Sequence, residues 1–210
     1  MTWKRTILTC AAAVAAVVLA AGCGGGDSGS QHPAEHGSST TASSPDHNDT
    51  DAGFAESMIP HHQQAIEMSD IVLTKQGIDP RVVELANQIK AAQGPEIDLM
   101  QGWLKQWGRP QMPMTPGGMD GHGDMPMMSG TPGMSGMMSQ EDMAALQNAQ
   151  GVEASKLFLT QMIAHHEGAI TMAQNEIKDG QYPAAIELSR SIVNSQQKEI
   201  DTMKGILPTL

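Results

Sequence analysis

Two pairs of adjacent histidines are candidate metal ligands, because imidazole is the side chain that proteins most often use to bind metal ions. His61 and His62 lie within MIPHHQQAIEM (58–68), and the second pair lies within MIAHHEGAITM (162–172). Each pair has a methionine on either side, and thioether sulfur is a ligand for soft ions such as Cu(I). The pattern indicates a metal-binding function with these candidate ligands: Met58, His61, His62, Met68, Met162, His165, His166 and Met172.

Both segments have the spacing of an amphipathic helix, in which steps of three and four residues return to one face. In the first segment that face contains Phe54, His61 and Val72, and the neighbouring row contains Ile59 and His62. The second segment repeats both rows. The histidines are therefore expected to point into a protein core, where they would need partners.

The second half of the chain repeats the first, which predicts the architecture. Residues 58–69 match residues 162–173 at 7 of 12 positions, and residues 89–104 match residues 192–207 at 8 of 16. Each copy has the pattern of a helical hairpin with one apolar side, which must be buried against another element. Aromatic residues make up only 3% of the chain, which favours packed helices over a β-sandwich. We expect an all-α four-helix bundle.

The two hairpins are expected at residues 51–107 and 139–210. Helices rise about 1.5 Å per residue, so equal lengths on either side of a turn bring the first histidine pair level with Glu96. The same counting brings the second pair level with Glu199. The second helices thus add the inward polar residues Gln93, Glu96, Gln196 and Glu199, and the methionines Met100 and Met203. A further inward row is expected at Val82, Leu85, Ile89, Ala92, Glu96, Leu99 and Trp103.

The repeated pattern M-I-x-H-H-x-x-A-I-x-M, followed by Q-x-x-E-I-D-x-M, resembles the bacterial family called domain of unknown function 305. The resemblance covers about residues 50–207, apart from the segment between the hairpins. It implies a ferritin-like four-helix bundle. Some members of the family are regarded as extracytoplasmic copper-binding proteins, so the resemblance also implies copper as the metal.

The linker between the hairpins, residues 108–138, has no helical pattern and holds nine of the 17 methionines in a Gly/Pro-rich background. Closely spaced thioethers suit Cu(I), and they persist in oxidising compartments where thiols are lost. The alternative is a low-complexity linker that binds nothing. Because the linker leaves the bundle at the end nearer the histidines, we expect it to fold over them or pass ions to them. Its candidate ligands are Met112, Met114, Met119, His122, Met125, Met127, Met128, Met134, Met137 and Met138.

Residues 1–22 have the features of a bacterial lipoprotein signal peptide, with Lys4 and Arg5 before an apolar run. The run ends in LAAGC, which resembles a lipobox and implies that Cys23 is lipidated; an ordinary secretory signal is the alternative. Residues 23–50 are rich in Gly, Ser, Thr and His, as in flexible tethers. We expect an extracytoplasmic protein whose only attachment to the cell membrane is this lipid anchor.

Composition narrows the function classes further. The net charge of −11 argues against nucleic-acid binding. With Cys10 in the signal peptide and Cys23 acylated, no thiol remains as a metal ligand. We favour copper sequestration or transfer, with Cu(I) preferred and Cu(II) or Zn(II) as other possibilities.

Two alternatives to copper binding remain open. The first is a structural or interaction module whose buried His, Gln and Glu bond one another and set the register of the hairpins. The second, less favoured, is a ferritin-like metal oxidase, which needs several carboxylates and a Glu-x-x-His motif that this sequence lacks. We therefore do not expect an enzyme.

Overall fold

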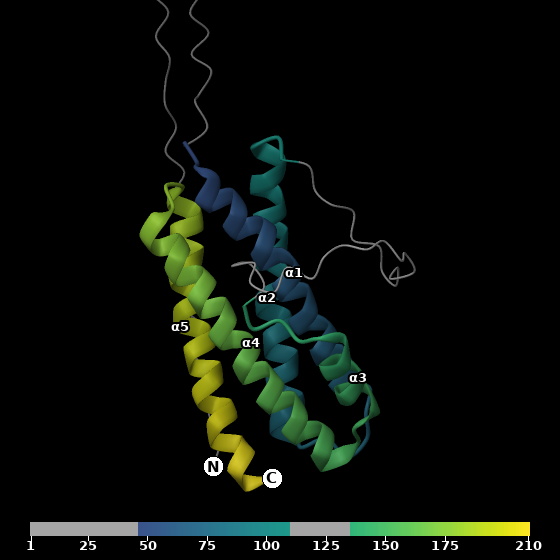
Figure 1. Ribbon diagram of the computed structural model, residues 1–210. Helices are drawn as coiled ribbons and strands as arrows, with labels where there is room; N and C mark the ends of the chain where they lie inside the picture. Colours follow the sequence, from purple (N-terminus) through teal and green to yellow (C-terminus); the bar gives the residue numbers. More distant parts are fainter. Residues whose placement is uncertain (1–45, 110–134) are drawn as a thin grey trace, which may run out of the picture. The chain divides into compact units, whose positions relative to one another are not determined.

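The computed structural model describes residues 46–109 and 135–210, in which all regular secondary structure is helical. The long helices are α1 (Asp49–Leu73), α2 (Pro80–Gln106), α4 (Gly151–Asp179) and α5 (Pro183–Ile206) (Figure 1). Helix α3 (Gln140–Asn148) packs beside α1 and α4, and a short 3₁₀ turn, η2 (Leu207–Thr209), follows α5. The predicted all-α bundle is confirmed. No helix in the described residues has the length and apolar character needed to cross a membrane.

Two hairpins, α1–α2 and α4–α5, make up the bundle, as the internal repeat predicts. The two helices of each hairpin pack extensively against each other. The hairpins meet mainly through α1 and α4, whereas α2 and α5 have little contact. In Figure 1, α1 (blue) and α4 (green) run past each other at the centre of the helices. Because α1 and α4 carry the histidine pairs, this docking places both pairs at one interface.

Short polar motifs set where the helices begin. Asn48 caps α1 by accepting hydrogen bonds from the backbone of the first turn, and the Asp51 carboxylate accepts one back from the Asn48 N–H. Asp79 caps α2 directly before Pro80, which tolerates the first helical position because its missing N–H has no partner there. A second capping box, with Ser139 as the cap, begins α3. Such caps satisfy backbone groups that the helix itself leaves unpaired.

Asp51 also ties the start of α1 to the turn between α4 and α5. Its Oδ1 accepts hydrogen bonds from the backbone N–H groups of Gln181 (3.0 Å) and Tyr182 (2.8 Å). Burial, together with the neighbouring Asp51, raises the pKa of Glu176 to about 8, so Glu176 is protonated at neutral pH. Asp51 and Glu176 therefore form a buried pair of carboxyl groups that carries a single negative charge.

The chain leaves α2 at the same end. Arg109 donates a hydrogen bond to Asp49, the first residue of α1, at 2.8 Å. The linker thus starts beside the beginning of α1, as the predicted topology requires. One expected feature of α2 is absent: Leu99, placed on an inward row by its spacing, is 47% exposed, and Ala92 is exposed as well. That flank of α2 has no helix to cover it, because α5 touches α2 so little.

Candidate metal centre

Four histidines meet at the interface between the hairpins. His61 and His62 from α1 and His165 and His166 from α4 are each at most 1% exposed. The rings of His61 and His165 are in contact, with centroids 3.7 Å apart and planes tilted by 41°. The helical spacing predicted burial for each pair, and the docking of α1 on α4 adds direct contact between the pairs. We call these four side chains the histidine layer.

The histidine layer separates two apolar clusters. On each long helix, the buried apolar residues on one side of the layer belong to one cluster and those on the other side belong to the second. The first cluster contains Met58, Met100 and Met172, and the second contains Met68, Met162 and Met203. The repeat relates each methionine of one cluster to a methionine of the other, so the layer lies at the centre of an approximate two-fold arrangement. The six predicted bundle methionines therefore flank the histidines evenly.

The two predicted glutamates contact the second histidine of each pair. We call His62 and His166 the outer histidines, because His61 and His165 contact each other at the centre of the layer. His62 Nε2 lies 2.7 Å from Glu96 Oε2, and His166 Nε2 lies 2.6 Å from Glu199 Oε2. Both glutamate side chains are 18% exposed, so their carboxylates reach solvent while the imidazoles do not. Counting residues along each hairpin predicted these levels. The glutamates are thus placed to orient the histidines.

These contacts assign the tautomers of three histidines. A carboxylate or a backbone carbonyl can only accept a hydrogen bond, so Nε2 of His62 and of His166 carries a hydrogen. Nε2 of His61 likewise donates to the carbonyl of Ser135 at 3.1 Å. In all three rings Nδ1 is buried without a partner, and in a neutral ring it is the lone-pair atom. Both ring nitrogens of His165 are unpaired as well.

Burial keeps the two central histidines neutral. Desolvation, and after it the nearby His62, lowers the pKa of His61 to about 3. Desolvation and the neighbouring His61 hold the pKa of His165 well below its usual value. Neutral imidazole is the form that binds metal ions. The histidine layer therefore presents lone pairs that a metal could take without first displacing a proton.

The donor set fits a soft or borderline metal ion. The four histidines have buried ring nitrogens without partners, two carboxylates accept hydrogen bonds from His62 and His166, and methionines lie in the apolar clusters on both sides. Metal-ligating histidines characteristically donate their other N–H to a carboxylate or carbonyl in this way. Within residues 46–109 and 135–210, no three His, Cys, Asp or Glu side chains converge in a metal-holding geometry.

Comparison with known families identifies the domain. The family model described as domain of unknown function (DUF305) matches residues 51–207. The chain belongs to this family. The predicted family resemblance is confirmed, whereas no curated protein matches the chain.

Solved structures of relatives agree with the DUF305 assignment. A DUF305 protein from Streptomyces coelicolor is 34% identical, with 76% of this chain and 93% of that chain covered and a TM-score of 0.65. A DUF305 fragment from Deinococcus radiodurans is 30% identical, with 79% and 100% covered and a TM-score of 0.65. CopM in its Cu(I)-bound form is 31% identical, with 77% and 98% covered and a TM-score of 0.59. CopM has also been solved in Cu(II)-bound and Ag-bound forms.

The structure describes the methionine-rich linker of this DUF305 protein at its two ends, residues 108–109 and 135–138. Met137 and Met138 are half-buried, and Met138 packs against the second apolar cluster. The other predicted linker ligands lie outside the described residues: Met112, Met114, Met119, His122, Met125, Met127, Met128 and Met134.

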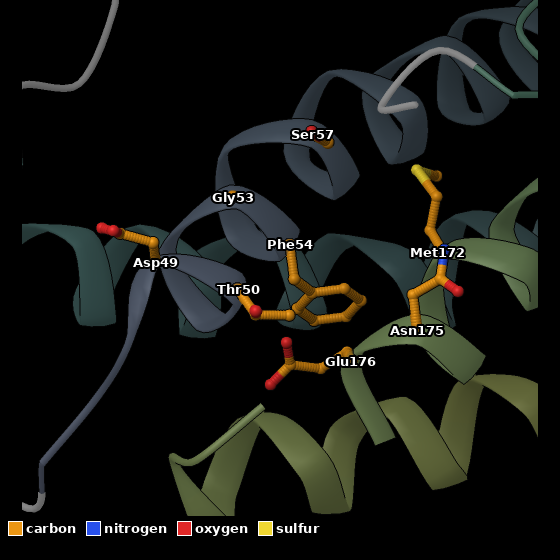
Figure 2. Close-up of a pocket in the computed structure, with 8 residues that line it drawn as sticks. All are labelled: Asp49, Thr50, Gly53, Phe54, Ser57, Met172, Asn175 and Glu176. Carbon is orange, nitrogen blue, oxygen red and sulfur yellow. The ribbon is translucent and has the colours of Figure 1, made fainter. Parts of the chain in front are cut away.

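A surface pocket of about 230 Å³ lies away from the histidine layer, at the end where α1 begins (Figure 2). Of the predicted ligands only Met172 lines it, together with Phe54 and the protonated Glu176. Figure 2 shows the Glu176 carboxyl group directed toward the Phe54 ring. The pocket and the histidine layer are therefore separate features.

Sequence reasoning missed the part that the linker end plays at the layer. Ser135 supplies the carbonyl that binds His61, and Gly136 packs on α4 against Gly168. One signal was available. Gly168 and Gln64 occupy equivalent positions in two segments that otherwise match closely, so the repeat breaks its symmetry one turn after the histidines.

Proposed function

We propose that this DUF305 protein binds copper in the histidine layer and sequesters or transfers it outside the cytoplasm. The observation that supports this most directly is the set of five buried ring nitrogens without partners. A buried polar atom left unpaired costs about 1–3 kcal/mol, so a layer that only locked the hairpins together would be expected to pair them. A metal ion would take the lone pair of each neutral ring, one per histidine.

The identity of the metal follows from the donor types. Imidazole suits Cu(II) and Zn(II), whereas thioether sulfur suits Cu(I). Because six buried methionines flank the layer, Cu(I) is the preferred ion. The Cu(I)-bound and Cu(II)-bound structures of CopM, at 31% and 33% identity, give this assignment its support from relatives.

The role we propose is binding rather than catalysis. In the described bundle, Glu96 and Glu199 are the carboxylates in contact with the layer, and each already accepts a hydrogen bond from a histidine. A carboxylate di-metal oxidase uses four glutamates and two histidines as ligands. This donor set supports a role in holding an ion rather than in oxidising it.

Copper titration of residues 24–210 tests the proposal. Anaerobic Cu(I) competition against a chromophoric chelator should reveal tight binding, which a variant with all four layer histidines replaced by alanine loses. A variant lacking residues 110–134 should keep the bundle-bound copper. Replacing His32 and His36 by alanine is the matched control, since it removes histidines of the tether and should change neither affinity nor the bundle-bound amount.

Two results would contradict the proposed site. An unmodified chain that binds no copper would support the structural or interaction module instead. Copper that is kept by the folded alanine variant but lost on deleting residues 110–134 would place binding in the linker. Circular dichroism of each variant shows whether its helices have formed, so a folding defect cannot be mistaken for lost binding.

We also propose that Cys23 anchors the protein to the outer face of the cell membrane, as the LAAGC segment suggests. Replacing Cys23 with serine should move the protein from the membrane fraction to the soluble fraction and should abolish incorporation of labelled palmitate. Replacing Cys10 with serine, within the signal peptide, should leave both unchanged. Membrane retention of the Cys23→Ser variant would rule out the lipid anchor.

A further inference from the structure

The last residues of the linker lie against the histidine layer. Residues 135–138, here called the strap, bond to α1 at three points. His61 Nε2 donates to the Ser135 carbonyl at 3.1 Å. The Gln64 amide binds Met138 twice: it donates to the Met138 carbonyl (2.9 Å) and accepts from the Met138 N–H (2.7 Å). The strap is thus fixed to the helix that carries His61.

On α4, the strap is seated by a contact between two glycines. Gly136 has a φ of +80°, and a Cβ there would come within 2.7 Å of the Ala164 carbonyl oxygen and 2.9 Å of the Gly168 Cα. A Cβ on Gly168 would overlap the carbonyl of Ser135. Such approaches are closer than side chains tolerate, so the strap docks only because both positions lack a side chain.

The docked strap supplies a hydrogen-bond acceptor to His61, as the two glutamates do to His62 and His166. Glu96 and Glu199 each accept the Nε2 hydrogen of an outer histidine, and the Ser135 carbonyl accepts that of His61. In each ring the contact leaves Nδ1 as the lone-pair atom. His165, the repeat partner of His61, has no such acceptor and both of its ring nitrogens are unpaired.

From this correspondence we propose that the strap is a positioning element of the metal site. Its Ser135 carbonyl sets the Nε2–H tautomer of His61, so that Nδ1 would be the atom available to a metal ion, and Gln64 together with Gly168 holds the carbonyl in place. The inference rests on the proposed copper site, because it assigns a role within that site. The proposal makes copper affinity depend on Gln64 and Gly168, although neither residue is a candidate metal ligand.

Gly168→Ala tests the strap with little risk to the fold. The added methyl group overlaps the strap, whereas alanine favours the α4 helix more than glycine does. Gly102→Ala in α2 is the matched control, since a Cβ there meets nothing within 4 Å. Gln64→Ala is a second variant that loosens the strap from α1 without touching α4.

The first readout is the His61 tautomer in the metal-free protein, taken from long-range ¹⁵N–¹H NMR spectra. The wild type and Gly102→Ala should show the Nε2–H form, and Gly168→Ala should lose it. The second readout is Cu(I) affinity, which should fall by about 10-fold or more in Gly168→Ala, the size expected when a metal-ligating histidine loses its orienting partner. Gln64→Ala should change both readouts in the same direction.

The two readouts separate the strap from the copper site. An unchanged His61 tautomer in Gly168→Ala, or an unchanged affinity once the tautomer has shifted, would overturn the role of the strap. A wild type that binds no Cu(I) would defeat the copper function, while the NMR comparison would still report whether the strap orients His61.

Discussion

Replacing His61 and His165 together with leucine is expected to raise the melting temperature of the metal-free protein by about 5–10 °C. The double variant should also lose the copper bound in the bundle. These two rings contact each other at the centre of the layer, and three of their four ring nitrogens are buried without a partner. Leucine has a similar volume and leaves no polar atom to satisfy, so the metal-free bundle should become more stable as the site is removed.

The size of this effect follows from the unpaired atoms. Each costs about 1–3 kcal/mol, and the substitution gives up the hydrogen bond from His61 to Ser135, worth about 1 kcal/mol. Three such atoms at about 1.2 kcal/mol each, near the low end of that range, less the lost hydrogen bond, give a net gain of about 2.5 kcal/mol. At roughly 2–4 °C per kcal/mol for a domain of this size, this gain gives the expected shift of about 5–10 °C. Sites that bind ligands commonly carry such a stability cost in the empty state.

Calorimetry with and without Cu(I) measures both effects. The control exchanges Ile89 and Ile192 for leucine, because these repeat partners are buried in the two apolar clusters and carry no candidate ligand. That change should cost less than about 1.5 kcal/mol and should leave copper binding intact. A fall in the melting temperature of the His61→Leu/His165→Leu variant would instead show that the histidines stabilise the fold, as the structural alternative requires.

The sequence predicted the local geometry of this site well, because that geometry depends on helical spacing alone. Burial of both histidines follows from their position among apolar residues on one helix face. The level of Glu96 beside His62 follows from equal helix lengths on either side of a tight turn. Both are properties of a single hairpin, and the repeat carries them into the second hairpin unchanged.

Features that depend on how the hairpins dock could not be predicted in this way. The contact between His61 and His165 requires α1 to pack on α4, and no pattern within one hairpin specifies that choice. The same docking leaves part of α2 uncovered, which is why Leu99 is exposed despite its spacing. The strap depends on a close backbone approach between Gly136 and Gly168, residues far apart in the chain that have no side chain to produce a pattern.

Replacing Glu96 with alanine is expected to lower the Cu(I) affinity of all the copper bound in the bundle by about 10–100-fold. Without the carboxylate, Nε2 of His62 loses its hydrogen-bond acceptor. The ring can then also adopt the tautomer in which Nδ1 carries the hydrogen and has no lone pair for a metal ion. Glutamine at this position should recover much of the affinity, because its amide oxygen can still accept the hydrogen. Because Glu96 is partly exposed, the free energy of unfolding should change by less than the binding free energy.

The shape of the Glu96→Ala titration distinguishes one shared site from two separate ones. The contact between His61 and His165 joins the two pairs, so we expect a single ion to draw on both hairpins and the whole isotherm to shift. Glu199→Ala should produce the same shift, since the repeat makes the two glutamates equivalent. Glu67→Ala is the control, because that side chain is exposed on the same helix as His62 and should change nothing. An isotherm in which half of the copper kept its wild-type affinity would mean that each hairpin binds its own ion, and the histidine contact would then be packing alone.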